Sequence, residues 1–201
     1  MARRTFFSFH YKSDVQRAQV VGQAWMTQDR EEVGFFNSSA FEKAERTNPE
    51  TLKAFLVAEM KGSSVVCVLV GSDTAFRRWV RFETFRGIWD ERGLLAVRIN
   101  GIAGWDRRTA VAGPNPFDLL GISVTENGGA KSVRFIERQT ASAQWTFSSD
   151  FPKTLPKWRY GSIPAAGSHT LSSLFPIHDW NNNGYSQVGN WIETAAIKAG
   201  R

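Results

Sequence analysis

An uninterrupted apolar run, "SVVCVLVG" at residues 64–71, constrains the fold of this chain more than any other feature. It is rich in β-branched residues and lies between a serine and a glycine, which is typical of a strand. Because it shows no polar alternation, both of its faces must be buried. We therefore predict a parallel sheet that is covered by helices on its two faces.

Strand and helix signals alternate along the first half of the chain. The predicted strands lie at 4–11, 64–71 and 94–99. The predicted helices lie at 14–27, from Asn48-Pro49 to near Gly62, and at 75–91 with Ser72 or Thr74 as the cap. Residues 34–41 are predicted to form a loop. This order predicts an open, doubly wound α/β sheet.

The pattern changes after residue 100. A long loop at 100–118 precedes a predicted hairpin around Asn127-Gly128-Gly129, with 142–148 as a third strand. Residues 149–180 are predicted to be irregular and 190–201 helical. We predict a single domain over 1–201: core β/α units at 1–100, an elaboration at 101–180 and a closing helix at 181–201.

Charge and composition limit the possible partners. The net charge of +6 favours an anionic partner, but the basic residues are scattered and match no nucleic-acid motif, so nucleic acid is not the expected partner. No segment approaches the roughly 20 apolar residues of a membrane helix, and the apolar run near the N-terminus is too short for a signal peptide. We expect a cytoplasmic protein without a membrane span.

The sequence lacks the motifs of several common kinds of functional site. Cys67 is the single cysteine and the three histidines are far apart, so the sequence predicts neither a disulfide nor a metal site. The dinucleotide-binding glycine fingerprint, the P-loop and the nucleophile elbow are also absent.

One acidic residue, in "RRWVRFETF" at 77–85, has unusual surroundings. On a helical wheel Glu83 shares a face with Trp79, Val80 and Gly87 and so lies on an apolar stripe. Burial of an unpaired carboxylate is costly, so two interpretations stay open. Glu83 pairs with an arginine such as Arg86 or one from a neighbouring element, or it lines the edge of a pocket.

A second apolar stripe on the same helix has two interpretations. It consists of Phe82, Phe85 and Trp89. Either the stripe is an assembly surface, or it is buried beneath the 100–180 elaboration.

Polar residues lie at the ends of two predicted strands. The strand at 4–11 ends with Ser8, His10 and Tyr11 and is followed by Asp14, and the strand at 64–71 leads into Gly71–Thr74. Open α/β sheets bind ligands at the carboxyl ends of their strands, and backbone amides at 71–74 could receive a phosphate. Ordinary turn and capping roles are the alternative.

Blocks along nearly the whole chain resemble the TIR-like, ThsB-type proteins of the bacterial Thoeris anti-phage system. They are "RRTFFSFHYKSDVQRAQVVGQAW", "VVCVLVGSDTAFRRWVRFETFRGIWDERGLLAVRING", "GPNPFD" and "HDWNNNGYSQVGNWIETAAIKAG". The resemblance implies a flavodoxin-like TIR fold with a C-terminal hairpin and loop elaboration. It implies an enzyme that cleaves NAD, releases nicotinamide and makes a cyclic or modified ADP-ribose signal for a separate effector.

The resemblance also implies roles for individual residues. Glu83 matches the catalytic glutamate through "WVRFE", while Ser8, His10, Tyr11, Phe36 and Trp79 would bind the substrate. NAD is the substrate, and no resident cofactor or metal is implied. Self-association and a phage-protein trigger are further expectations. Non-catalytic TIR domains that act as interaction or sensor modules are the alternative, and a nucleic-acid-binding or nucleotide-processing protein is a third.

Overall fold

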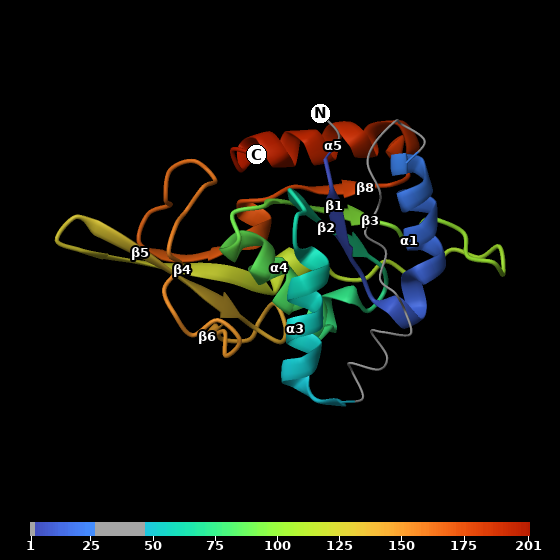
Figure 1. Cartoon of the computed structure of the whole chain (residues 1–201). Coiled ribbons are helices and arrows are strands. Elements are labelled where there is room, and N and C mark those ends of the chain that lie inside the picture. Colours follow the sequence, from blue (N-terminus) through green and yellow to red (C-terminus); the bar gives the residue numbers. More distant parts are fainter. Residues whose placement is uncertain (1–2, 27–46) are drawn as a thin grey trace.

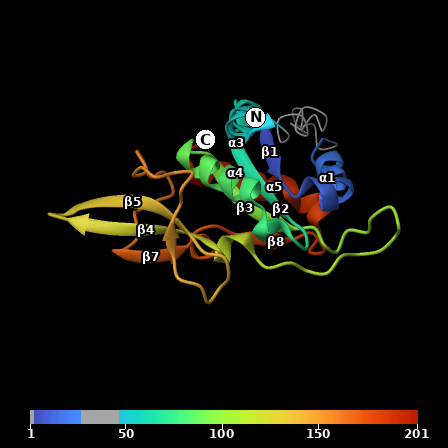
Figure 2. The ribbon, with the colours of Figure 1, turned by 90° about the horizontal axis from the view of Figure 1, so that it is seen from below.

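The computed structural model describes residues 3–26 and 47–201, which form a parallel sheet and an antiparallel sheet (Figures 1 and 2). The parallel sheet has the strand order β1-β2-β3-β8. Its strands are β1 (Thr5–Ser8), β2 (Val65–Val70), β3 (Gly93–Arg98) and β8 (Ile177–Asp179). β2 pairs in parallel with β3 over its whole length and with β1 over Val65–Val68, so the apolar run occupies the interior of this sheet.

Helices cover both faces of the parallel sheet. On one face α1 (Tyr11–Met26) and α5 (Gly184–Lys198) pack against the side chains of Val65, Cys67 and Leu69. On the other, α3 (Pro49–Met60) and α4 (Arg78–Trp89) pack against those of Val66, Val68 and Val70. In Figure 1, α5 crosses the top of the molecule and α4 lies behind α3. The prediction of a parallel sheet between two helical layers is confirmed.

The second sheet extends away from α1 and α5. It has the order β6-β5-β4-β7, and its strands are β4 (Leu120–Asn127), β5 (Ala130–Glu137), β6 (Thr146–Phe147) and β7 (Gly167–Thr170). Gly128 and Gly129 both have positive φ, of 57° and 81°, which allows the tight turn between β4 and β5. The predicted hairpin is confirmed, and β6 falls inside the predicted third strand.

Some predicted boundaries are wrong. The first strand ends at Ser8, and α1 already begins at Tyr11. The segment 149–180, predicted to be irregular, contains β7, a short 3₁₀ turn (Leu171–Ser173) and the whole of β8. These pieces have three or four residues, too few to show a periodic pattern. The closing helix begins at Gly184, six residues before the predicted start, directly after the left-handed Asn183.

The two sheets share one apolar core. Phe85 of α4 stacks on Phe135 of β5 with ring centroids 4.5 Å apart, and Phe82 stacks on Phe151 at 5.4 Å. Trp89 lies 5.7 Å from the ring of Phe151. The second apolar stripe of α4 is therefore buried beneath the elaboration, and the alternative of an assembly surface is wrong for it. No helix in the described part of the chain is long and apolar enough to span a membrane.

Candidate active site

The start of α4 determines where Glu83 lies. The predicted helix at 75–91 is divided: Thr74–Phe76 form a 3₁₀ turn (η1), Arg77 is extended, and the α-helix begins at Arg78. Glu83 is therefore in the second turn of α4. This late start brings its side chain closer to the carboxyl ends of the strands than a helix from residue 75 would.

Gly87 lets α4 approach the sheet closely. A Cβ atom built on Gly87 would lie 2.8 Å from a methyl carbon of Val66, closer than real Cβ contacts. Val80, Glu83 and Gly87 lie on one helical face, as the wheel predicts, and all three are buried. Because the helix sits directly on β2, the residue one turn before Gly87 reaches the end of β1.

At that position the carboxyl group of Glu83 meets the hydroxyl of Ser8. Glu83 is only 3% exposed and Ser8 is fully buried at the last position of β1. The Oγ of Ser8 donates a hydrogen bond to Oε2 of Glu83. Residues 75 positions apart in sequence thus form one buried polar pair.

The described residues provide no cation for this carboxyl. Arg86 binds Asp90 instead, with 2.9 Å between Nε and Oδ2, so the interpretation of a salt bridge between Glu83 and Arg86 is wrong. Burial raises the pKa of Glu83 to about 8, and the hydrogen bond from Ser8 opposes this only in part. The site holds a carboxyl group that is mainly neutral near pH 7 and that a cationic ligand would convert to a carboxylate.

His10 and Tyr11 lie two and three residues after Ser8, at the junction of β1 and α1. Both are half-buried. Nδ1 of His10 lies 2.8 Å from the hydroxyl of Ser13. Burial lowers the pKa of His10, and the charge of Arg77 lowers it further. A largely neutral imidazole and a phenol therefore stand at the strand end that carries Ser8.

A buried aspartate connects the ends of β1 and β2. Oδ2 of Asp14 lies 3.5 Å from Oγ1 of Thr74, which accepts a hydrogen bond from the amide of Gly71 at 2.9 Å. A Cβ on Gly71 would lie 2.2 Å from Asp14 Oδ2, so only glycine fits there. Because Thr74 already binds the Gly71 amide, this amide is not free for a phosphate, and its role is that of an ordinary turn. The predicted helix cap by Ser72 or Thr74 is wrong, since the N-cap residues of η1 and α4 are Asp73 and Arg77 and neither makes a side-chain capping hydrogen bond.

The sequence predicted a long loop at 100–118 but not its course: residues 100–115, the strap, cross the ends of β2 and β3. The guanidinium of Arg98 donates to the carbonyl of Gly113 at 2.8 Å, and the hydroxyl of Ser72 donates to that of Val111 at 2.7 Å. A Cβ on Gly113 would lie 2.3 Å from the carbonyl oxygen of Gly71. The glycine before Pro114 was the available signal.

One predicted substrate-binding residue, Trp79, makes its ring contacts away from this pair. Trp79 is half-buried, its ring packs edge-on against Phe82 at 6.1 Å, and the guanidinium of Arg78 lies 4.8 Å above it. These contacts belong to the α3 side of the core, although Trp79 precedes Glu83 by one turn. Phe36 lies outside the described residues.

The described residues contain no group of three or more His, Cys, Asp or Glu side chains arranged to hold a metal ion.

Comparison with known proteins identifies a family and a relative. The model of the family described as "Thoeris protein ThsB, TIR-like domain" matches residues 6–103. A protein of Bacillus cereus named "Putative cyclic ADP-D-ribose synthase ThsB1" is 32% identical over 200 residues, which cover 96% of this chain and 100% of that protein.

Proposed function

The chain belongs to the ThsB family of TIR-like Thoeris proteins, and from this premise we propose that it cleaves NAD and makes a cyclic or modified ADP-ribose. The similarity to a protein named as a putative cyclic ADP-D-ribose synthase extends over 96% of the chain. The proposed activity is therefore that of an NAD glycohydrolase of the ADP-ribosyl cyclase type.

One observation carries the assignment of the catalytic residue. Glu83 is buried at the carboxyl end of the parallel sheet, hydrogen-bonded to Ser8 and to no described cation. A buried carboxyl group without a cationic partner does not belong to a structural ion pair. It is instead well placed to bind a positively charged group of a ligand. Glu83 is therefore our candidate for the residue that touches the reacting ribose.

The chemistry follows from the charge of the substrate. The nicotinamide ring of NAD is already cationic, so it can leave with the electron pair of the glycosidic bond without a strong general acid. The ribose that remains resembles an oxocarbenium ion, as in glycoside cleavage. The carboxylate of Glu83 stabilises that charge in a site where screening by water is weak. An internal nucleophile of the same ADP-ribose then closes the ring.

Ionisation of Glu83 is part of this proposal. In the free protein the pKa of about 8 keeps most Glu83 carboxyls neutral near pH 7. A nearby positive charge favours the ionised form of a carboxyl, so binding of the cationic nicotinamide riboside lowers this pKa. Ser8 supports the change, since its hydroxyl donates to the carboxylate oxygen.

The remaining residue assignments belong to the same proposal. His10 and Tyr11, which stand beside Ser8 at the end of β1, would contact the ribose and phosphate groups. Phe36 and Trp79 are proposed as further substrate contacts on the strength of the family resemblance. NAD is consumed as a substrate, and we propose no resident cofactor.

The wider role is also proposed. The nucleotide product would activate a separate Thoeris effector, a phage protein would act as the trigger, and the reaction would take place in the cytoplasm. Self-association is proposed on the strength of the family resemblance.

A direct assay tests the activity. The purified protein is incubated with NAD, and free nicotinamide and the nucleotide products are separated by chromatography. We expect Glu83→Gln to lose at least about a thousandfold in rate, since it removes the charge from the reacting centre. Glu126→Gln, at an exposed position of the β4–β5 hairpin, is the matched control and should keep full activity. Full activity of Glu83→Gln would refute the catalytic assignment. No nicotinamide release by the wild-type protein, alone or in lysate of phage-infected cells, would refute the enzyme itself.

A further inference from the structure

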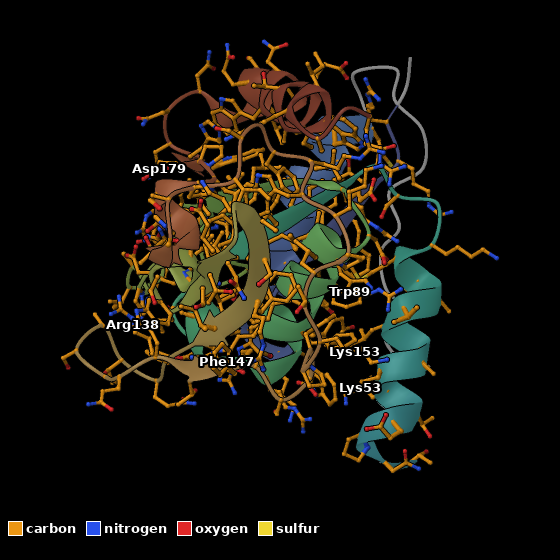
Figure 3. The ribbon with its side chains drawn as sticks, turned by 90° about the vertical axis from the view of Figure 1, so that its left-hand side faces the viewer. Lys53, Trp89, Arg138, Phe147, Lys153 and Asp179 are labelled. Atoms are coloured by element: carbon orange, nitrogen blue, oxygen red, sulfur yellow. The ribbon has the colours of Figure 1, made fainter. Side chains whose placement is uncertain are left out.

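A cleft of about 450 Å³ lies between α4 and β6, at a site separate from Glu83. Its volume is within the range of small-molecule sites. The residues that line it include Arg78, Arg81, Glu137, Thr146, Phe147 and Asp150. Figure 3 views the molecule from the end that carries the antiparallel sheet and labels Phe147, with Lys53 on α3 to its right.

Arg81 is a buried guanidinium whose hydrogen bonding is incomplete. It is 6% exposed; Nε donates to the carbonyl of Ala75 at 3.1 Å and Nη1 to that of Arg138 at 3.3 Å. Nη2 is buried and has no hydrogen-bond partner among the described residues. Buried polar groups are rarely left unpaired, because desolvation without a partner is costly. An acceptor brought by a ligand would complete this guanidinium.

The nearby carboxylate does not satisfy Arg81. Oε2 of Glu137 lies 3.5 Å from Nη1, well beyond the usual separation of a charge-assisted hydrogen bond. Glu137 therefore offsets the charge of Arg81 without occupying its Nη2 group.

Arg78 can be released to a ligand at low cost. Its Nη2 binds Oδ1 of Asp150 at 3.1 Å, but its side chain is 54% exposed, and such surface pairs are weak. Asp150 also binds Nζ of Lys53 at 2.9 Å. If Arg78 turns towards a ligand, Asp150 keeps Lys53 as its cation.

Two aromatic rings on the lining are unusually exposed. Phe76 and Phe147 are 55% and 52% exposed. The guanidinium of Arg134 covers one face of Phe147 at 3.8 Å from the ring centroid, which holds that ring in position. Exposed rings next to arginines suit a flat apolar group.

We propose that this cleft is a second ligand site, which binds an oxyanion attached to a flat ring. The phosphate or carboxylate would bind Arg81 and Arg78, and the ring would pack against Phe147 and Phe76. The site is independent of the proposed NAD cleavage: Arg81 contacts Glu137 and Arg138 at the end of β5, whereas Glu83 contacts Ser8 of β1.

Calorimetric titration with phenyl phosphate tests the proposal, because this probe combines both groups. Inorganic phosphate and phenol each carry one of them, and we expect both to bind more weakly than phenyl phosphate. Phe147→Ala and Arg78→Ala change exposed side chains and should each weaken phenyl phosphate binding by about fivefold or more. Arg81→Gln should abolish it, with circular dichroism as the check on folding.

Matched variants make the result decisive. Arg107→Ala removes an exposed arginine of the strap, and Glu83→Gln alters the proposed catalytic site. Both should bind phenyl phosphate as the wild-type protein does. Absence of binding to the wild-type protein, or unchanged binding by both Phe147→Ala and Arg78→Ala, would overturn the proposal. Loss of binding in Glu83→Gln would assign the probe to the other site and would overturn it as well.

Discussion

Replacement of Glu83 by glutamine should change how stability depends on pH. The folded pKa is about 8 and the ordinary value of a glutamate is 4.5, so the folded state holds the proton more tightly than the unfolded chain does. A raised pKa contributes stability that is complete below pH 4.5 and is lost as the pH rises through 8. At about 1.4 kcal/mol for each tenfold change, the wild-type protein should lose about 3 kcal/mol between pH 5 and pH 8 through this group.

Glutamine has the shape of the protonated acid but cannot ionise, so Glu83→Gln should not show this loss. The assay is guanidinium unfolding, followed by circular dichroism at several pH values from 5 to 8, for wild type, Glu83→Gln and the control Glu126→Gln. The glutamine amide changes the absolute free energy of unfolding through its own hydrogen bonds. The comparison therefore uses the slope of the free energy of unfolding against pH. For a chain of this size about 3 kcal/mol corresponds to roughly 6–12 °C in Tm. Parallel curves for wild type and Glu83→Gln would refute the inference that a neutral acid is buried beside Ser8.

Four more predictions follow from the same structure. Because the ionised form of Glu83 is the active one, log kcat/KM for NAD should rise with a slope near one as the pH increases. The rise should flatten near pH 8, where the pKa of Glu83 in the free enzyme lies. A kcat/KM that falls over this range would contradict the catalytic role of the ionised Glu83. Ser8→Ala removes the hydrogen bond that lowers the pKa of Glu83, so kcat/KM at pH 7 should fall by about tenfold and the midpoint of the pH profile should move upward. Gly87→Ala places a Cβ 2.8 Å from a methyl carbon of Val66, so it should lower the free energy of unfolding, measured by denaturation, by about 1–3 kcal/mol. Adding Val66→Ala to the same chain should restore part of this loss. Additive losses from the two substitutions would disprove the steric explanation. Burial raises the pKa of the Cys67 thiol, so the folded protein should not react with a thiol-directed dye and should react fully in denaturant.

The layered fold could be predicted because long apolar patterns carry it. The buried run at 64–71 forms β2, and the Asn48-Pro49 start of α3 appears as expected, with the Asn48 side chain accepting from the amide of Thr51. The hairpin could be predicted from two adjacent glycines. The strands β7 and β8 could not, since each has three or four residues and depends on its pairing with distant strands.

The candidate site could be predicted in part. The helical wheel correctly places Glu83 on an apolar, buried side of its helix, but the wheel cannot reveal which strand end lies opposite. That depends on the break at Arg77 and on the fit of Gly87 to Val66, which are three-dimensional properties. The position of Trp79 shows the same limit, because residues one turn apart on α4 contact different parts of the core.

The buried carboxyl of Glu83 also sets how much of the free protein is ready to react at a given moment. With a pKa of about 8, roughly one molecule in ten is ionised at pH 7 and roughly one in four at pH 7.5. Because a cationic ligand favours the ionised carboxyl, NAD binding near pH 7 would be coupled to the release of a proton from most copies. The apparent affinity for NAD would therefore rise with pH and level off near pH 8.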